Sequence, residues 1–182
     1  MIGSIGNVIT KLFGKKSDKD VKEISPLVKE VLLEQEKLKN VSSDELRANS
    51  ERFRLEIKEY IRPEEDHIIK IKSEADKLGV PVKEKETLYK QIDEINKDID
   101  KKIEEVLNKI LPKAFANIRE TARRFKDNET IEVTASDFEK NIAHLRDNFE
   151  IKDDKAIYST TWEAGGNEIR WDMEHYQVQL VG

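Results

Sequence analysis

The stretch at residues 88–110, LYKQIDEINKDIDKKIEEVLNKI, decides the fold of this 182-residue chain. Apolar residues recur along it at spacings of 4, 3, 4, 4, 3 and 4, and most of the other positions are charged. Such spacing gathers apolar side chains on one face of an α-helix, and one step departs from a strict heptad, which shifts the stripe locally. We therefore predict a long helix with one apolar stripe, formed by Leu88, Ile92, Ile95, Ile99, Ile103, Val106 and Ile110.

A partner helix is expected just upstream, at residues 64–78. Gly79 follows it and Pro81 comes two residues later, an arrangement typical of a helix end. The two helices would form an antiparallel, coiled-coil-like hairpin with Gly79, Val80 and Pro81 at its tip. The alternative is a single long, solvated helix that crosses a domain, and the sequence leaves both open.

Two more helices are expected before the hairpin. One covers about residues 20–38, and the next begins at Ser42, where Glu45 three residues later completes a capping box. Leu46 and the apolar residues after it line one face of this second helix. Proline cannot donate a backbone hydrogen bond and disrupts a helix interior, so we expect Pro63 to end it.

After the stripe, Pro112 is expected to interrupt the helix, which resumes over residues 113–125. Beyond Asn128 the residue pattern changes. Residues 130–133 alternate as in a short strand, and Ser136 could cap a helix through Leu145. The inward face of the resumed helix would carry Ala114, Phe115, Ile118, Ala122 and Phe125.

A β-hairpin is expected near the C-terminal end. Residues 156–162 and 168–171 are rich in β-formers and flank a glycine-containing turn. Trp162 and Trp171 are expected to pack against each other across the two strands rather than to form a ligand cage.

Composition favours elongated helices over a thick core. Charged residues make up 39% of the chain and apolar residues 37%, an apolar share below that of an average globular protein. The net charge of −5 is spread along the chain, so nothing indicates a nucleic-acid partner. With no cysteine there can be no disulfide and no thiol nucleophile. We expect a mainly α fold with a small β element.

Residues 1–14 have the pattern of an amphipathic helix with a basic flank. That composition is usual for reversible binding to an anionic membrane surface. A frayed helix that packs on its own domain is the alternative. The residues that would contact the membrane are Ile2, Ile5, Ile9, Leu12, Phe13, Lys11, Lys15 and Lys16.

No apolar run is long enough to span a membrane, and the start lacks the pattern of a secretory signal, so a cytoplasmic location is expected. Residues 178–182 resemble an apolar strand that enters a glycine turn. A chain seldom finishes in this way, and we expect it to be part of a longer polypeptide.

Catalytic and metal-binding motifs are missing. His67, His144 and His175 lie far apart in the sequence, and none has the spacing of a metal site. There is no nucleophile elbow and no glycine-rich phosphate loop. The sequence therefore indicates no catalytic residue and no metal ligand.

Four stretches, in order, resemble the SecA family, the ATPase motors of bacterial preprotein translocation. They are residues 1–14, residues 43–54 with SDELRA, residues 111–124 with LPKAFA, and residues 173–182, MEHYQVQLVG. The segments between them are absent from shorter family members and are similar to insertions in Bacteroidetes versions.

The resemblance implies a domain organisation built around the start of a RecA-like α/β nucleotide-binding domain, which would be incomplete here. The implied parts are an amphipathic N-terminal helix (1–14), helices that begin the nucleotide-binding domain (15–61), a charged helical insertion (62–110), a further helix of that domain (111–125), an α+β insertion with a hairpin (126–171) and a Q-motif strand (172–182).

The resemblance also implies a nucleotide-binding role for the last stretch. In the family, the glutamine of the Q motif recognises adenine, for which an amide offers one acceptor and two donors. Gln179 would be that residue, and Tyr176 and Met173 would contact the base. The sequence departs from the family pattern at Tyr176, where the family has phenylalanine, and at Gln177, where it has aspartate. The alternative is a plain sheet strand with Gln179 facing solvent.

The implied function is that of the N-terminal part of a protein-translocating motor. Implied partners are the SecYEG channel, the anionic membrane surface and the preprotein, with a possible homodimer and peripheral association with the inner membrane. Mg²⁺ would be held only by residues downstream of this chain. A stand-alone helical coiled-coil adaptor is the alternative function, supported by the stripe and the high charge.

We expect the 182-residue chain alone to bind ATP weakly or not at all and not to hydrolyse it. Phosphoryl transfer depends on a phosphate loop and acidic metal ligands for positioning and charge stabilisation, and the sequence shows none of them. Phosphate release by the purified chain measures this, and ATP turnover in a clean preparation would contradict the expectation.

Overall fold

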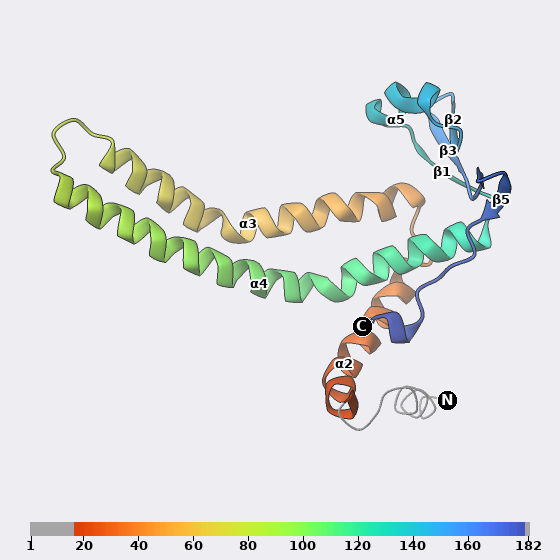
Figure 1. Ribbon diagram of the computed structural model, residues 1–182, viewed down its shortest axis with the longest axis horizontal. Helices are drawn as coiled ribbons and strands as arrows, with labels where there is room; N and C mark the ends of the chain where they lie inside the picture. The colour runs from red at the N-terminus through yellow and green to blue at the C-terminus, as the bar shows by residue number, and fades with distance from the viewer. Residues whose placement is uncertain (1–16, 181–182) are drawn as a thin grey trace. The chain divides into compact units, whose positions relative to one another are not determined.

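The computed structural model describes residues 17–180. The chain divides into two compact units, one formed by residues 50–111 and the other by the residues up to 49 together with those from 112 onward. Helices dominate, and the small sheets are antiparallel (Figure 1). The expected mainly α class with a small β element is confirmed.

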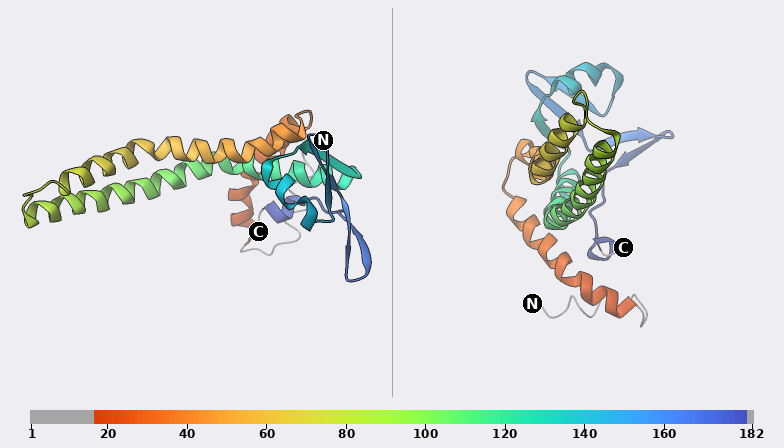
Figure 2. Two further views of the ribbon diagram at one scale, coloured as in Figure 1. Left: turned by 90° about the horizontal axis from the view of Figure 1, so that it is seen from above. Right: turned by 90° about the vertical axis from the view of Figure 1, so that its left-hand side faces the viewer.

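The unit at residues 50–111 is an antiparallel helical hairpin. It consists of the later part of α3, Ser43–Ala75, and the earlier part of α4, Val82–Asp127. Figures 1 and 2 show the two helices side by side from every direction drawn. The chain reverses near Gly79, whose φ of +86° lies in the left-handed region that glycine adopts at no steric cost. The hairpin is therefore confirmed over the single crossing helix.

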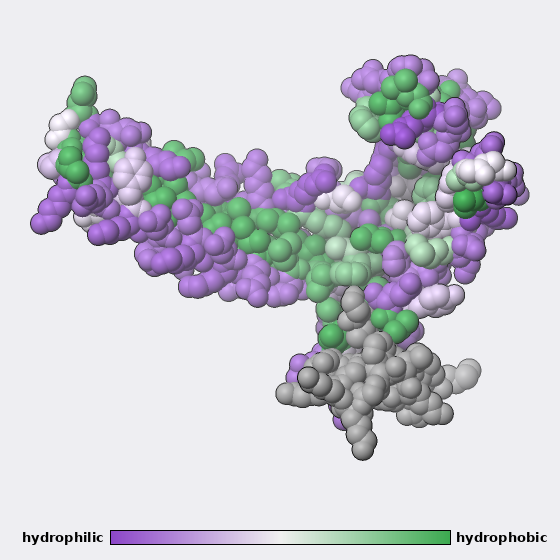
Figure 3. Space-filling view, viewed as in Figure 1, coloured by the Kyte–Doolittle hydropathy of each residue, from purple (hydrophilic) through white to green (hydrophobic). Residues whose placement is uncertain are grey.

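The predicted stripe forms the seam of this hairpin. Ile92 on α4 packs against Ile68 and Ile71 on α3, and Leu88, Ile95 and Ile99 close the cluster. Figure 3 shows apolar surface gathered along the seam, with charged surface on both sides. Polar contacts fix the register further along, because Lys102 Nζ lies 2.5 Å from Glu64 Oε1 and the Tyr60 hydroxyl donates to Glu105 at 2.9 Å.

The prolines do not end the helices, and the two breaks predicted at Pro63 and Pro112 are wrong. Pro63 lies inside α3 and Pro112 inside α4. An interior proline costs about 3 kcal/mol because it lacks the N–H and crowds the preceding turn. Packing on both sides outweighs that cost: Ile68 is buried just after Pro63, and Pro112 is itself buried. The third interior proline, Pro26, lies in α2, Ser17–Leu38.

The other unit contains α2, the start of α3 and the end of α4. The capping box at the start of α3 is confirmed, since Glu45 N–H donates to Ser42 Oγ at 3.1 Å and Ser42 N–H donates to Glu45 Oε2 at 2.9 Å. Apolar burial among these helices comes from short or branched side chains: Val28, Val31, Leu46, Ala116 and Ala122.

The predicted inward face of the end of α4 is only partly right. Ala122 is buried, and Ala114 and Phe125 are half-buried. Phe115 and Ile118 are 38% and 56% exposed, because this part of the helix turns Ala116 and Glu120 inward instead. Apolar periodicity misplaced the face because a charged residue, Glu120, occupies its centre.

A three-stranded antiparallel sheet follows α4, with strand order β1-β3-β2. The strands are β1 Thr130–Thr134, β2 Phe149–Lys152 and β3 Lys155–Ser159. Between β1 and β2 lie α5, Asp137–Ile142, and the 3-10 turn η1, Ala143–Leu145. The predicted β1 and the cap at Ser136 are confirmed, but the α-helix ends at Ile142 and the predicted residues up to Leu145 form the 3-10 turn. The short strand β2 was missed. The core of this sheet is Val133, Ala135, Phe149 and Ala156.

A β-hairpin forms at the predicted glycine turn, but its first strand is shorter than expected, because residues 156–159 belong to β3 of the other sheet, and the tryptophan pair is wrong. Strands β4, Thr161–Ala164, and β5, Asn167–Arg170, flank Gly165 and Gly166, both with positive φ. Trp162 lies opposite Ile169. Trp171 follows the strand and its ring instead contacts Phe125 of α4, with centroids 5.9 Å apart.

Replacement of Ile71 by alanine should lower the free energy of unfolding of the hairpin by about 2–5 kcal/mol, because Ile71 is buried in the seam. The matched control is Ile69→Ala, two residues away and 63% exposed, for which the change should stay within about 0.5 kcal/mol. Thermal and urea unfolding followed by circular dichroism measure both. Equal losses for the two variants would contradict the seam described here.

Candidate functional site

The last described residues fold into a turn rather than the predicted strand. Residues 177–180 form the 3-10 helix η2, Gln177–Leu180. The Gln179 N–H donates to the Tyr176 carbonyl at 2.9 Å, and the Gln179 side-chain oxygen accepts from the Tyr176 N–H at 2.7 Å. A strand needs a neighbour to pair its backbone groups. Within residues 17–180 every strand pairs with another part of the chain, so this segment satisfies its own backbone.

Arg119 of α4 holds this C-terminal segment in place. Its Nε donates to the His175 carbonyl at 2.7 Å, and its Nη2 lies 3.0 Å from the Glu174 carboxylate. Its Nη1 donates to Gln35 Oε1 of α2 at 2.6 Å, and Gln35 is buried. The planar guanidinium presents several donors in a fixed fork, so a single side chain links α2, α4 and the C-terminal segment.

A second tether lies at the start of the segment. The Trp171 indole N–H donates to the Met173 carbonyl at 2.7 Å, and the Trp171 N–H donates to the Thr160 carbonyl at 2.8 Å. Together with the ring contact to Phe125, these bonds bring the chain from the β4–β5 hairpin back to α4. We name the segment at residues 171–180, with Arg119 and Gln35, the Arg119 clamp.

The three residues expected to contact a nucleotide all lie in the Arg119 clamp. Met173 is 45% exposed, Tyr176 is 73% exposed, and Gln179 is also exposed. Among residues 17–180, Nε2 of Gln179 has no hydrogen-bond partner, and its Oε1 has a second lone pair for another donor. The segment therefore carries a free amide donor and acceptor beside an accessible aromatic ring.

The residues expected to contact a membrane, namely Ile2, Ile5, Ile9, Leu12, Phe13, Lys11, Lys15 and Lys16, lie outside the described residues. Within the part of the chain that is described, no helix is both long and apolar enough to cross a membrane. His67 and His144 are exposed and His175 is half-buried. No grouping of three or more potential metal ligands occurs among residues 17–180.

A buried carboxylate one residue after Arg119 organises the same helix. Glu120 is 0% exposed, and both of its oxygens accept from arginines: Arg123 donates at 2.8 and 2.9 Å, and Arg124 at 2.9 Å. Burial alone would raise the pKa of Glu120, but these charge-assisted hydrogen bonds outweigh it and hold the pKa below its usual value. The hydrogen bond with Glu120 also raises the pKa of Arg123.

Arg124, which is held by Glu120, also binds the connection between α2 and α3. Its Nη2 donates to the carbonyls of Leu38 at 2.9 Å and Val41 at 2.7 Å, and its Nη1 donates to Ser43 Oγ at 3.3 Å. The last carbonyls of a helix have no partner within the helix. Arg124 therefore caps α2 and fixes the start of α3.

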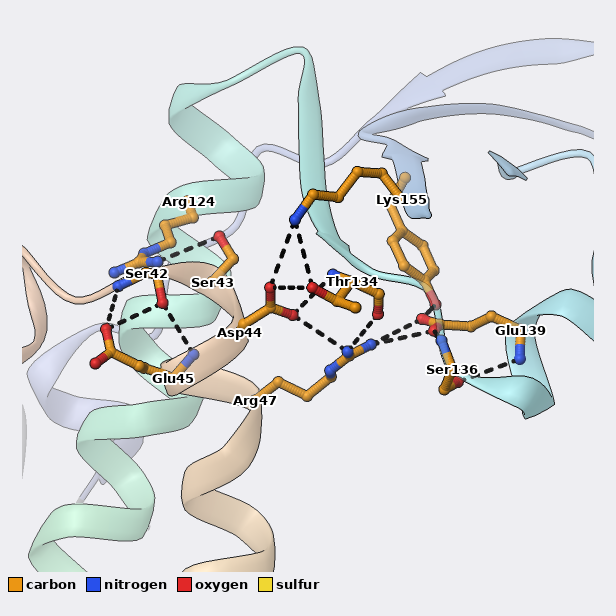
Figure 4. A network of polar contacts seen from close by, with 11 residues as sticks. Ser42, Ser43, Asp44, Glu45, Arg47, Arg124, Thr134, Ser136, Glu139 and Lys155 are labelled. Carbon is orange, nitrogen blue, oxygen red and sulfur yellow. Dashed lines mark hydrogen bonds and ion pairs between the residues drawn. The ribbon is translucent and has the colours of Figure 1, made fainter. Parts of the chain in front are cut away.

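A further polar network, drawn in Figure 4, joins the start of α3 to the sheet. Arg47 donates to the Glu139 carboxylate at 3.0 Å and to the Thr134 carbonyl at 2.6 Å. Asp44 accepts from the Thr134 N–H at 2.8 Å and from its hydroxyl at 2.7 Å, which lowers the pKa of Asp44. The two side chains thus fix the end of β1 against α3.

Glu139 is the buried centre of that network. Ser136 N–H donates to it at 2.7 Å, and the Tyr158 hydroxyl also donates to it. Burial opposes ionisation of Glu139, yet the bonds from Tyr158 and Ser136 and the nearby Arg47 lower its pKa. Burial and the same hydrogen bond raise the pKa of Tyr158 to about 12. Both networks stabilise structure, and neither has the arrangement of a nucleophile and its base.

Of the Arg119 clamp, the sequence predicted only the C-terminal segment with Met173, Tyr176 and Gln179. Arg119 and Gln35 lie 84 residues apart, and Arg47 and Glu139 lie 92 apart, so no local spacing connects them. The cluster of Glu120, Arg123 and Arg124 did carry a signal. Opposite charges three and four residues apart share one helix face, and their place among small apolar residues could have indicated burial.

The fold and the clamp define a mainly helical module with small antiparallel sheets that presents a tethered glutamine segment. Comparison with known proteins identifies the family. Residues 9–182 match the SecA DEAD-like domain, and the chain belongs to this family. No solved structure matches the chain.

The relatives are protein translocase subunits. The chain is 44% identical to "Protein translocase subunit SecA" of Azobacteroides pseudotrichonymphae genomovar. CFP2 over 98% of its own length and 16% of that protein's. The protein of the same name from Porphyromonas gingivalis strain W83 is 43% identical over 96% of this chain, and that from Parabacteroides distasonis is 44% identical over 96%. The chain spans 15–16% of the length of these relatives. The expected kinship with Bacteroidetes versions of the family is confirmed.

Replacement of Glu120 by glutamine should lower the free energy of unfolding near pH 7 by about 3 kcal/mol, because it leaves the partly buried Arg124 without its counter-charge and Arg123 with Asp127 alone. The folded-state pKa of Glu120 is lowered, so its stabilising effect is present above its unfolded pKa and is lost as the pH falls through the folded value. Stability of the variant should therefore decline less steeply below about pH 4 than that of the wild type.

Urea unfolding at a series of pH values measures this effect. The control is Glu132→Gln, which removes an exposed carboxylate from β1 and should leave the free energy of unfolding and its acid dependence close to wild type. An unchanged acid dependence in Glu120→Gln would show that Glu120 is not ionised in the folded protein.

Proposed function

We propose that this chain supplies the adenine-recognising segment and the membrane-contacting start of an ATP-driven preprotein-translocation motor. Membership of the SecA DEAD-like domain family and the printed name of its relatives support a role in protein translocation. The observation that carries the adenine assignment is the Arg119 clamp. It holds the carbonyl of His175 and the carboxylate of Glu174 and leaves the side chains of Tyr176 and Gln179 accessible.

In this proposal Gln179 recognises the base. Its amide nitrogen donates to a ring nitrogen of adenine, and its oxygen accepts from the exocyclic amine. Tyr176 and Met173 contact the base and exclude water from those hydrogen bonds. Arg119 is a positioning residue, because it acts on the base only through the backbone of the segment that it holds.

Phosphate binding and Mg²⁺ coordination belong, in this proposal, to other parts of a longer polypeptide. The relatives are several times longer than this chain, so the channel, the preprotein, the inner-membrane surface and a homodimer are proposed as partners of the whole protein. Family membership favours the motor over the stand-alone adaptor.

Replacement of Gln179 by alanine in the full-length gene product should weaken ATP binding about tenfold, the loss expected for two hydrogen bonds to the base. Gln177→Ala is the matched control, since it removes the same amide two residues earlier, and it should change the Kd less than about twofold. Titration with a fluorescent ATP analogue, competed with unlabelled ATP and GTP, measures both. Equal effects of the two substitutions, or an unchanged preference for ATP over GTP in Gln179→Ala, would contradict the assignment.

A further inference from the structure

The tip of the helical hairpin exposes apolar side chains that no described residue covers. Leu78 is fully exposed and Val82 is 75% exposed, although both are aliphatic and lie close together in the chain. Gly79, with its positive φ, and Pro81 form the tight turn between them. Figure 3 shows apolar surface at this end of the hairpin. The hairpin's own stability does not require these side chains, because the seam at Ile68, Ile71 and Ile92 lies elsewhere.

The charge of the hairpin changes sign along its length. The tip-proximal part, residues 70–90, has six lysines against four carboxylates, whereas the stem, residues 50–69 and 91–111, has twelve carboxylates against eight basic residues. In the stem, three lysines form ion pairs: Lys97 with Glu94, Lys101 with Asp98 and Lys102 with Glu64. Among residues 17–180, no carboxylate lies within 4 Å of any of the six lysines near the tip. The tip-proximal part therefore has a net charge of +2, with Asp76 and Glu84 next to Lys77 and Lys83, whereas the stem has a net charge of −4.

We propose that this tip, residues 76–82, inserts into an anionic lipid surface. Leu78 and Val82 would enter the boundary between headgroups and acyl chains, and Lys77 and Lys83 would lie at the level of the phosphates. Aliphatic side chains next to lysines suit such a boundary, because the apolar part leaves water while the ammonium groups stay among the headgroups. The acidic stem is repelled by the same surface, so the hairpin binds by its end rather than along its side.

A protein groove would accept Leu78 and Val82 equally well, but it would not account for the change of charge along the hairpin. The lipid surface accounts for it. The proposed site is independent of residues 1–16 and of the nucleotide assignment.

The chain contains no cysteine, so a single introduced thiol reports on one position. Leu78→Cys, labelled with the fluorophore NBD in the full 182-residue chain, should show a blue shift and protection from aqueous quenchers with phosphatidylglycerol–phosphatidylcholine vesicles. Vesicles of phosphatidylcholine alone should produce little change. The matched control is Leu107→Cys with the same label, because Leu107 is 47% exposed but lies on the acidic stem, and its emission should not shift.

A second variant tests the charge. Lys77→Gln combined with Lys83→Gln should weaken the response of the Leu78 label about fivefold per lysine, and raised salt should weaken it further. An unchanged label at position 78 with anionic vesicles overturns the proposal even if the protein binds them, since another segment then carries the binding. Equal shifts at positions 78 and 107 overturn it as well. A response to an added protein but not to vesicles would replace lipid by a protein groove.

Discussion

The carboxylate of Glu120 is the constraint on which one unit of the structure depends. A charge with no exposed surface is tolerated only when it is paired and fully hydrogen-bonded, and Arg123 and Arg124 meet that condition. Arg124 then has donors left for the carbonyls that end α2 and for the hydroxyl at the start of α3. The neighbouring Arg119 extends from the same helix to the C-terminal segment. One turn of α4 thus determines where α2 ends, where α3 begins and how the glutamine segment is held.

Local patterns predicted what local forces decide. The stripe from Leu88 to Ile110 became the seam, and the capping box at Ser42 and the cap at Ser136 formed as expected, because periodicity and caps act within a few residues. The helix breaks expected at Pro63 and Pro112 were wrong because tertiary packing, which is not local in sequence, decides there. A local penalty of about 3 kcal/mol is smaller than the packing on either side of it, and sequence spacing does not measure that packing.

The candidate site was predictable only in part. Gln179, Tyr176 and Met173 were found through a family resemblance, whereas Arg119 and Gln35, which hold them, were not, because their contacts join residues far apart in the sequence. The prediction of a terminal strand was wrong because a β-strand needs a second segment of backbone with which to pair. Without a neighbour among the described residues, the segment closed on itself through Gln179 and Tyr176.

The separation of partners along the chain also sets an order of assembly during synthesis. The seam joins residues about twenty positions apart, such as Ile71 and Ile92, so it can form as soon as both helices have left the ribosome. The bond between Arg119 and Gln35 spans 84 residues, and the carbonyl of His175 that Arg119 holds lies a further 56 residues along the chain. Short-range contacts form fastest and long-range ones wait for the chain. A nascent chain would therefore carry a finished hairpin while the last carbonyls of α2 are still bonded to water instead of to Arg124.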